Sequence, residues 1–262
     1  AIHSGGSTSL SVTDSTFTAN RALSGVGGAI SSNAETTTLD QTTFTDNSAV
    51  SGEGGAVNAS SSDGVLTVTG SDFISNTAQY GGGISTSAGS ATIRQVAFSG
   101  NSAEWGGGLR CIAGALMVTA STFTSNTANN GGAAYLQGNV TAMIADSDFI
   151  SNTASSGGAL SVIDNAVVTL IGSALSGNSA TDSGGAMLSG SFASQTPRLT
   201  ASACTFTDNT AANGGGAVCH SAGVITLTGS TFDHNSAVFF GGAVNNYAAL
   251  TVTGSTFTLN TA

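Results

Sequence analysis

Short runs in which apolar residues alternate with threonine recur along the chain. Residues 66–69 read Leu-Thr-Val-Thr, and residues 250–253 repeat the same order. Alternation with a period of two is typical of a β-strand, because successive side chains point to opposite faces of the sheet. Helix signals are absent, and the one proline, Pro197, lies in the longest repeat, where an inserted loop can accommodate it. The pattern therefore predicts short strands with one apolar face and one hydroxyl-bearing face.

A second pattern, Phe-x-x-Asn, recurs every 25 to 31 residues. The asparagine is present in all ten copies, whereas leucine replaces phenylalanine once, at Leu175. The asparagines are Asn20, Asn47, Asn76, Asn101, Asn126, Asn152, Asn178, Asn209, Asn235 and Asn260. The aromatic positions are Phe17, Phe44, Phe73, Phe98, Phe123, Phe149, Phe206, Phe232 and Phe257.

A Gly-Gly pair follows each of the first nine asparagines, and a small residue and an apolar residue usually come next. Gly54-Gly55-Ala56-Val57 is an example. Glycine permits a positive φ or a close approach of two backbones, which larger residues resist. We therefore expect the chain to turn sharply at each pair.

A repeat of about 26 residues with two or three strands is too short for a two-layer unit and fits one turn of a solenoid. The predicted fold is all-β, a right-handed, single-stranded parallel β-helix of about ten turns. We expect residues 1–262 to form a single segment of a longer repeat-containing chain. In such a coil the phenylalanines stack into an inward column and the asparagine amides form a hydrogen-bonded ladder at a corner.

The composition mainly excludes classes of partner. Charged residues make up 7% of the chain, and 14 acids stand against four arginines and no lysine, for a net charge of -10. Nucleic acids and anionic membrane surfaces attract basic proteins, so we expect neither as a partner. The chain also lacks an apolar run of about 18 residues that could span a bilayer.

The three cysteines are too few for a disulfide framework or a zinc site. We expect small buried thiols at Cys111, Cys204 and Cys219. A Cys204–Cys219 bridge is the alternative, because both residues fall in one repeat.

The repeated tetrapeptides resemble those of the polymorphic outer-membrane proteins of chlamydiae. Residues 157–160, Gly-Gly-Ala-Leu, follow Phe149 and Asn152 as a strict copy, and residues 81–84 and 131–134 are weaker ones. The resemblance covers essentially the whole chain. Members of that family are surface-displayed, autotransporter-type adhesins with β-helical passengers, so it implies an extracellular protein that adheres to another cell.

Catalysis is not expected from the distribution of charged residues. Pectin lyases and polygalacturonases share the β-helix fold, but they use clustered Asp residues or bound calcium with Arg or Lys on one face. Here the acids are scattered: Asp46 and Asp208 occupy the same repeat position six turns apart. We predict no enzymatic activity and no cofactor or metal. His220, His234 and Asp233 are the one group that invites a metal or a base, and we interpret these histidines, like His3, as polar residues at outward positions.

Aromatic residues are the better functional candidates. Tyr80, Trp105 and Phe240 each stand directly before a Gly-Gly pair, and Phe239 accompanies the last. Variable corners on a rigid scaffold are where binding residues collect. Tyr80 and Trp105 belong to adjacent turns and are expected either to form one platform or to fold over the edge of the core. The predicted partner is a protein or glycan on a host or neighbouring cell; the alternative is other copies of the chain, in a structural filament.

Two asparagines, Asn58 and Asn139, fall in glycosylation sequons. These would be used only in a eukaryotic secretory pathway.

Overall fold

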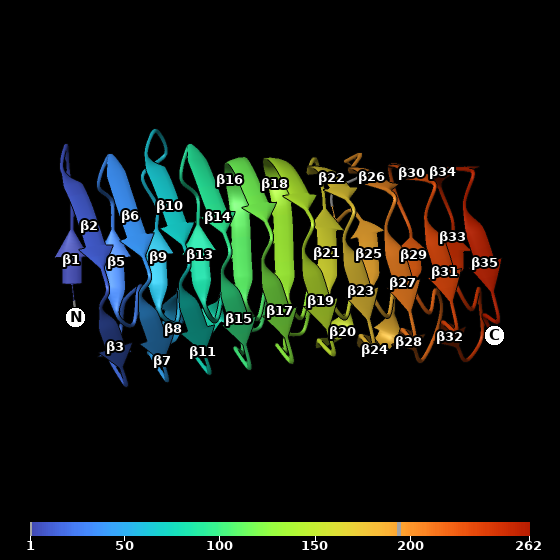
Figure 1. Ribbon diagram of the computed structural model, residues 1–262, viewed down its shortest axis with the longest axis horizontal. Helices are drawn as coiled ribbons and strands as arrows, with labels where there is room; N and C mark the ends of the chain where they lie inside the picture. The colour runs from blue at the N-terminus through green and yellow to red at the C-terminus, as the bar shows by residue number, and fades with distance from the viewer. Residues whose placement is uncertain (1, 193–194) are drawn as a thin grey trace.

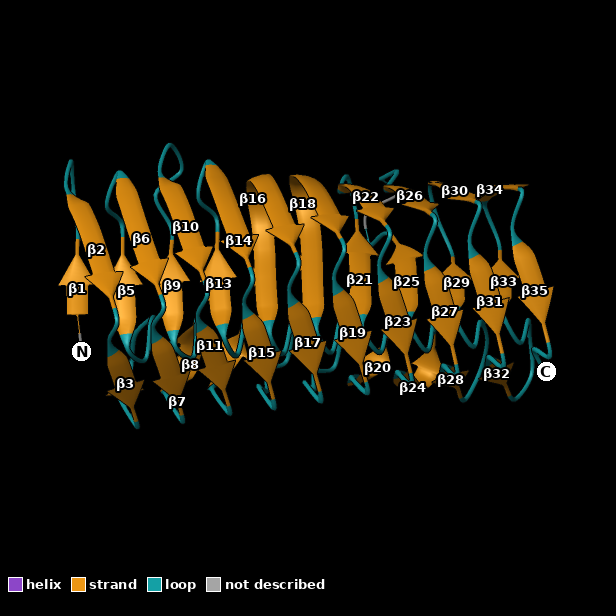
Figure 2. Ribbon diagram, in the orientation of Figure 1, coloured by secondary structure: helices purple, strands orange, loops and turns teal. Residues whose placement is uncertain are grey.

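The computed structural model describes residues 2–192 and 195–262, which contain strands, turns and bends and no helix (Figures 1 and 2). The chain coils into a rod of stacked turns, with its two ends at opposite ends of the long axis. Successive turns pair in parallel and in register: Phe73 lies opposite Phe98, and Val68 lies opposite Ile93. The predicted parallel β-helix is confirmed, with ten turns in the sheet that carries the phenylalanines.

The largest sheet is bent into two columns. The first contains the strands that follow the Gly-Gly pairs, together with β1: β1 (Ile2–Ser4), β5 (Ile30–Ser32), β9 (Val57–Ala59), β13 (Ile84–Thr86), β21 (Leu160–Ile163), β25 (Met187–Gly190), β29 (Val218–His220) and β33 (Val244–Asn246). The second contains the alternating runs: β2 (Ser9–Thr13), β6 (Thr36–Asp40), β10 (Val65–Thr69), β14 (Ser90–Arg94), β22 (Val167–Ile171), β26 (Arg198–Ser202), β30 (Val224–Thr228) and β34 (Ala249–Thr253). Two long strands, β16 (Leu109–Thr119) and β18 (Ala134–Ala145), run through both columns.

The other faces are made of shorter strands. The phenylalanine sheet comprises β3 (Thr16–Thr18), β7 (Thr43–Thr45), β11 (Asp72–Ile74), β15 (Ala97–Ser99), β17 (Thr122–Thr124), β19 (Asp148–Ile150), β23 (Ala174–Ser176), β27 (Thr205–Thr207), β31 (Thr231–Asp233) and β35 (Thr256–Thr258). The last face holds two small sheets: β4 (Arg21–Ala22), β8 (Ser48–Glu53) and β12 (Thr77–Tyr80), then β20 (Thr153–Ser156), β24 (Ser179–Ser183), β28 (Thr210–Ala211) and β32 (Ser236–Ala237). Isolated parallel bridges join these two sheets.

The two glycines of each pair are required for different structural reasons. Gly54 has φ +69°, in the left-handed region that other residues rarely adopt. Gly55 has an ordinary φ, but a Cβ placed on it would lie 2.1 Å from the carbonyl oxygen of Gly82 in the next turn. The first glycine is thus required by the turn and the second by the close approach of neighbouring turns.

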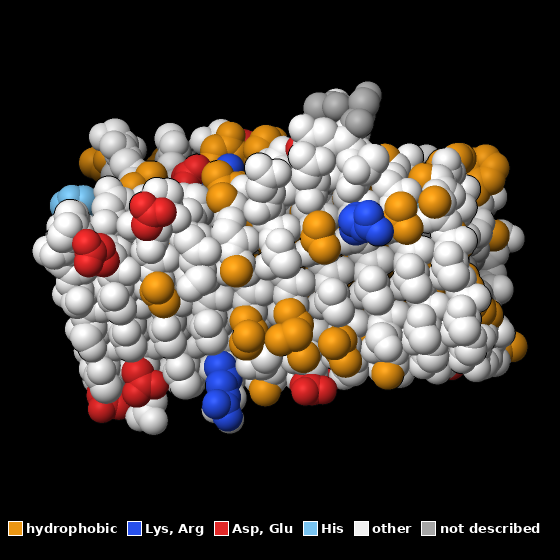
Figure 3. Space-filling view, turned by 90° about the horizontal axis from the view of Figure 1, so that it is seen from above, with side chains coloured by type: hydrophobic (Ala, Val, Ile, Leu, Met, Phe, Trp, Pro, Cys, Tyr) orange, Lys and Arg blue, Asp and Glu red, His pale blue; other side chains and the backbone are white. Residues whose placement is uncertain are grey.

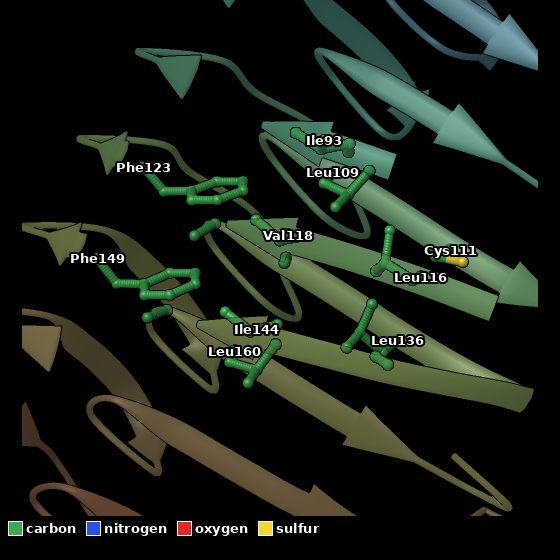
Figure 4. Packing of buried hydrophobic residues seen from close by; sticks show 14 of the residues in the cluster. Ile93, Leu109, Cys111, Leu116, Val118, Phe123, Leu136, Ile144, Phe149 and Leu160 are labelled. Atoms are coloured by element: carbon green, nitrogen blue, oxygen red, sulfur yellow. The ribbon is translucent and has the colours of Figure 1, made fainter. Parts of the chain in front are cut away.

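Apolar side chains from the phenylalanine sheet and from both columns of the largest sheet fill the interior (Figure 4). Phe123 and Phe149 stack with ring centroids 4.9 Å apart and planes 4° apart, and both rings are buried. Equivalent stacking runs from Phe17 to Phe149 and from Phe206 to Phe257. Leu175 occupies the gap and is fully buried. A buried apolar side chain is therefore present at this position in the turn where ring stacking is interrupted.

The asparagines form a hydrogen-bonded ladder along the corner after the phenylalanine strands. In Asn101 the backbone N–H and the Nδ2 group both donate to Oδ1 of Asn126, at 3.0 and 2.9 Å. Its Nδ2 also donates to the carbonyl oxygen of Phe73 at 2.8 Å. A second ladder, of serine hydroxyls, precedes the phenylalanines; Ser121 N donates to Ser147 Oγ at 3.2 Å. Polar groups at both corners are thereby satisfied inside the rod.

Candidate binding site

The residues immediately before the Gly-Gly pairs form a column that we call the corner column. Its members pair from turn to turn in parallel: Glu53, Tyr80, Trp105, Asn130, Ser156, Ser183, Gly214 and Phe240. A second row consists of the residues at the second position of the first-column strands, and we call it the outer row. It includes Ser85, Arg110 and Tyr135, which pair from turn to turn. These side chains lie on the outer face, because their neighbours Leu109 and Cys111 face the core.

The structure brings Tyr80 and Trp105 together. Their ring centroids are 5.0 Å apart, with planes inclined by 41°. Trp105 also stacks on Tyr135, with centroids 5.4 Å apart and planes 23° apart. Tyr135 is fully buried, whereas Tyr80 and Trp105 remain half-buried. The rings thus rest on the outer row and keep part of their surface exposed.

Charged side chains lie next to the aromatic ring of Tyr80. Arg110 Nη1 donates to Glu53 Oε1 at 2.7 Å, and the Arg110 guanidinium carbon lies 4.7 Å from the centre of the Tyr80 ring. The Arg110 side chain is only 8% exposed and that of Glu53 is 33% exposed. A partly desolvated ion pair and a cation–π contact both hold the aromatic rings in place. We call Glu53, Tyr80, Trp105, Arg110 and Tyr135 the corner cluster.

Phe239 and Phe240 lie apart from the corner cluster. Phe240 belongs to the same corner column, where it pairs with Gly214. Phe240 is 55% exposed and Phe239 is 66% exposed, and their ring centroids are 6.3 Å apart. They form a second, more exposed aromatic patch with Val238.

The histidines do not gather into a site. The interpretation of His220 as an outward residue is wrong: it is fully buried, with Nε2 3.2 Å from the carbonyl oxygen of Ala249. It points inward because it is the third residue of its strand, after the inward Val218 and the outward Cys219. His234 is exposed and lies 3.0 Å from Asp233. Within residues 2–192 and 195–262, no three His, Cys, Asp or Glu side chains group as metal ligands.

All three cysteines are free and buried. Burial raises the pKa of the Cys111 thiol to about 12, and it raises the pKa of Cys204 and Cys219 as well. The nucleophilic thiolate is therefore disfavoured at each position. Cys204 occupies a place in the serine ladder, where Sγ donates to the carbonyl oxygen of Ser202 at 3.2 Å.

The two sequons differ in accessibility. Asn58 is 2% exposed and its amide nitrogen lies 3.3 Å from Ser60 Oγ. Asn139 is exposed, at the bend of β18. Only the Asn139 amide is presented to solvent by this fold.

Glu53, Arg110 and Tyr135 were not predicted from the sequence as parts of the cluster. The available signal was positional: Arg110 and Tyr135 hold the same repeat position in adjacent turns, three residues after the second glycine of the corner. Strand alternation places that position outward, although nothing in the sequence indicates that the corner rings cover it.

The comparisons with known proteins support the repeat assignment. The family model of the Chlamydia polymorphic membrane protein repeat matches residues 41–60, 120–137 and 203–221. Each segment contains a Phe-x-x-Asn copy and the Gly-Gly corner after it, in the second, fifth and eighth turns. No curated protein and no solved structure matched the chain significantly. The part of the chain that the structure describes contains no helix able to cross a bilayer. The resemblance predicted from the tetrapeptides is thus confirmed at three places: these segments are similar to the Chlamydia polymorphic membrane protein repeat, and each lies in one turn of the parallel β-helix.

Proposed function

We propose that this chain is a non-catalytic, extracellular surface scaffold whose β-helix presents the corner cluster for adhesion to a protein or glycan on another cell. Two observations fit such a scaffold. The repeats are those of a membrane-protein family. The surface is poor in charge: Figure 3 shows a face on which acidic and basic side chains are few and scattered.

The observation that carries the proposal is the half-exposed pair Tyr80 and Trp105, held against the outer row. Aromatic side chains supply a large contact area at interfaces. Here their conformations are already restrained by Arg110 and Tyr135. A partner would therefore bind without the entropic cost of ordering these rings.

Adherence of beads coated with the purified chain to cultured cells tests this proposal. Trp105→Asn is a suitable variant, because Asn130 occupies the same place in the next turn. We expect coated beads to adhere and the variant to lose most of that adherence. Tyr247→Asn is the matched control, since Tyr247 is 66% exposed and lies outside the corner column.

Three outcomes would contradict the proposal. One is adherence to none of the cell types tested, and another is equal adherence of the Trp105→Asn variant. The third is assembly of the purified chain into long fibres without adherence, which would favour the structural filament. In the second case, loss of adherence with Phe240→Asn would place binding at the other aromatic patch.

A further inference from the structure

The outer face of the second column carries an exposed apolar patch. Large apolar side chains on the strands from β10 to β22 are between 38% and 42% exposed there, and we call them the methionine patch: Val65, Met117, Met143, Val167 and Ile171. A hollow of about 380 Å³ lies beside the two methionines, above small residues of β14, β16 and β18. In Figure 3 apolar side chains gather near the middle of this face. Exposed apolar patches mark interaction sites, and methionine suits them because its side chain adapts its shape.

The patch is symmetric about Met117. Its strand, β16, is the middle one of five, with β14 and β18 one turn away and β10 and β22 two turns away. Val65 and Val167 are the first residues of β10 and β22, and the parallel register places them in one row, at equal distances on opposite sides of β16. A two-fold axis that runs parallel to β16 and passes over Met117 therefore exchanges the two valine positions.

The charged side chains of this face follow the same symmetry with opposite signs. Arg94 ends β14 and Asp146 directly follows β18, so they lie one turn to either side of Met117 at the same end of the strands. Arg198 begins β26 and Glu35 directly precedes β6, three turns to either side at the other end. All four are exposed, and none of them forms an ion pair in the part of the chain that the structure describes. Each positive charge thus has a negative counterpart at the symmetric place.

We propose that the methionine patch is a contact between two copies of this chain, which pack face to face as antiparallel rods around a two-fold axis at Met117. Met117 then meets Met117 of the second copy, and Val65 meets Val167 of the second copy. Met143 of each copy covers Thr92 of the other, which lines the hollow. The contact uses no residue of the corner cluster, so it goes beyond the proposed adhesion and holds or fails independently of it.

The charges select this orientation of the two copies. In it Arg94 faces Asp146 of the second copy and Arg198 faces Glu35 of the second copy. Each ion pair forms twice, because a two-fold contact is self-complementary. If the axis ran along the rod instead, Arg94 would face Ser90 of the second copy and both arginines would lack a counter-charge. Ion pairs at the rim of an interface favour one orientation over others more than they add affinity.

The size of the face is sufficient for a reversible dimer. The strands from β6 to β26 span about 29 Å along the rod at a strand spacing of about 4.8 Å, and five residues of strand are about 16 Å long. Two copies would thus bury roughly 1,000 Å² in total, at the lower limit of specific interfaces. We therefore expect a monomer and a dimer in equilibrium.

Sedimentation velocity of the purified chain over a concentration series tests the proposal. The mass should rise with concentration from that of one chain, 25.3 kDa, toward twice that value. Arg94→Asp and Asp146→Arg each turn both central attractions into repulsions, so each variant alone should associate at least tenfold more weakly. An equal mixture of the two variants should associate again, because the charges then attract across the contact in both places. This recovery also shows that both variants are folded.

Met117→Thr tests the apolar part of the contact. Threonine already occupies this row at Thr92 in the turn before, so the fold should tolerate it while association becomes several-fold weaker. Arg21→Asp and Asp72→Arg are the matched controls, since both residues are exposed and lie in β4 and β11, outside the second column. Both should associate as the unmodified chain does.

The proposal is overturned if the unmodified chain remains a monomer throughout the series, or if either charge variant alone associates as tightly as it does. Failure of the mixture to associate, or equal weakening by the two controls, would overturn it as well. A monomer that binds phosphatidylcholine vesicles, and loses that binding with Met117→Thr, would assign the patch to a lipid surface instead.

Discussion

Asn126 and Asn152 are joined by two hydrogen bonds that converge on one oxygen. The backbone N–H and the Nδ2 group of Asn126 each donate to Asn152 Oδ1 at 3.0 Å. Asn126 Nδ2 also donates to the carbonyl oxygen of Phe98 at 2.9 Å. One side chain therefore satisfies buried groups in the turn before it and the turn after it, which explains why asparagine recurs at this corner in every turn.

Asn126→Ala should lower the free energy of unfolding by about 2–4 kcal/mol, because it removes the acceptor of the buried Asn101 backbone N–H and a side-chain donor to the Phe98 carbonyl oxygen. Guanidinium unfolding followed by circular dichroism measures the change. The matched control Asn129→Ala changes an exposed asparagine and should cost less than about 0.5 kcal/mol. Equal effects of the two substitutions would show that the ladder adds nothing to stability.

The phenylalanine column should tolerate leucine better than alanine. Phe123 is buried between Phe98 and Phe149, so Phe123→Ala is expected to cost about 3–5 kcal/mol through the cavity it leaves. Phe123→Leu reproduces the situation at Leu175, which is fully buried in the same column, and should cost clearly less. Thermal melts of both variants test this order, and a leucine variant as unstable as the alanine variant would contradict it.

Glu53→Gln should destabilise the chain by about 1–2 kcal/mol, because it removes the counter-charge of the buried Arg110; the partial exposure of Glu53 limits the loss. Chemical denaturation measures the change. The control Glu104→Gln alters an exposed glutamate that lies 3.4 Å from Gln79. A similar small effect from both variants would mean that Arg110 does not depend on Glu53.

The repeating part of the fold was predictable because each recurrent residue type has one physical role that repeats in every turn. Asn126 hydrogen-bonds to backbone groups at a corner, Phe123 fills a layer of the core, and the Gly54-Gly55 pair allows a turn and a close backbone contact. Two further left-handed corners were not predictable. Ala120 and Ser125 adopt φ +48° and +54° although neither residue type favours that region. Other turns place glycine at these corners, at Gly70 and Gly100, but Ala120 and Ser125 occupy the same places, so the residue type there gives no consistent signal.

The candidate site was predictable only in its aromatic half. Tyr80 and Trp105 stand out because the chain has only three tyrosines and one tryptophan, and because both residues precede a Gly-Gly pair. The other half depends on side chains that meet across turns. Arg110 reaches back over two turns to Glu53, and Tyr135 is buried by Trp105 from the turn before. Such contacts are set by the direction in which long side chains extend, which spacing along the sequence does not give.

Buried His220 predicts a loss of stability in mild acid. Burial lowers the pKa of this imidazole below its ordinary value of 6.5, an effect that exceeds the opposing influence of the Ala249, Gly223 and Ser189 carbonyls. Above pH 6.5 the histidine is neutral in both the folded and the unfolded chain. Below pH 6.5 the unfolded chain binds the proton more readily than the folded chain does. The free energy of unfolding therefore decreases as the pH is lowered, by up to about 1.4 kcal/mol per pH unit, until the pKa of His220 in the folded chain is passed.

Urea unfolding at pH 7 and pH 5 measures this loss, and His220→Asn should reduce it. Asparagine is a conservative choice, because Asn246 occupies the same strand position in the next turn. The control His234→Asn removes an exposed imidazole and should retain the acid sensitivity of the unmodified chain. If His220→Asn loses as much stability between pH 7 and pH 5 as the unmodified chain, the prediction is wrong. Protonation of groups other than His220 would then account for the loss.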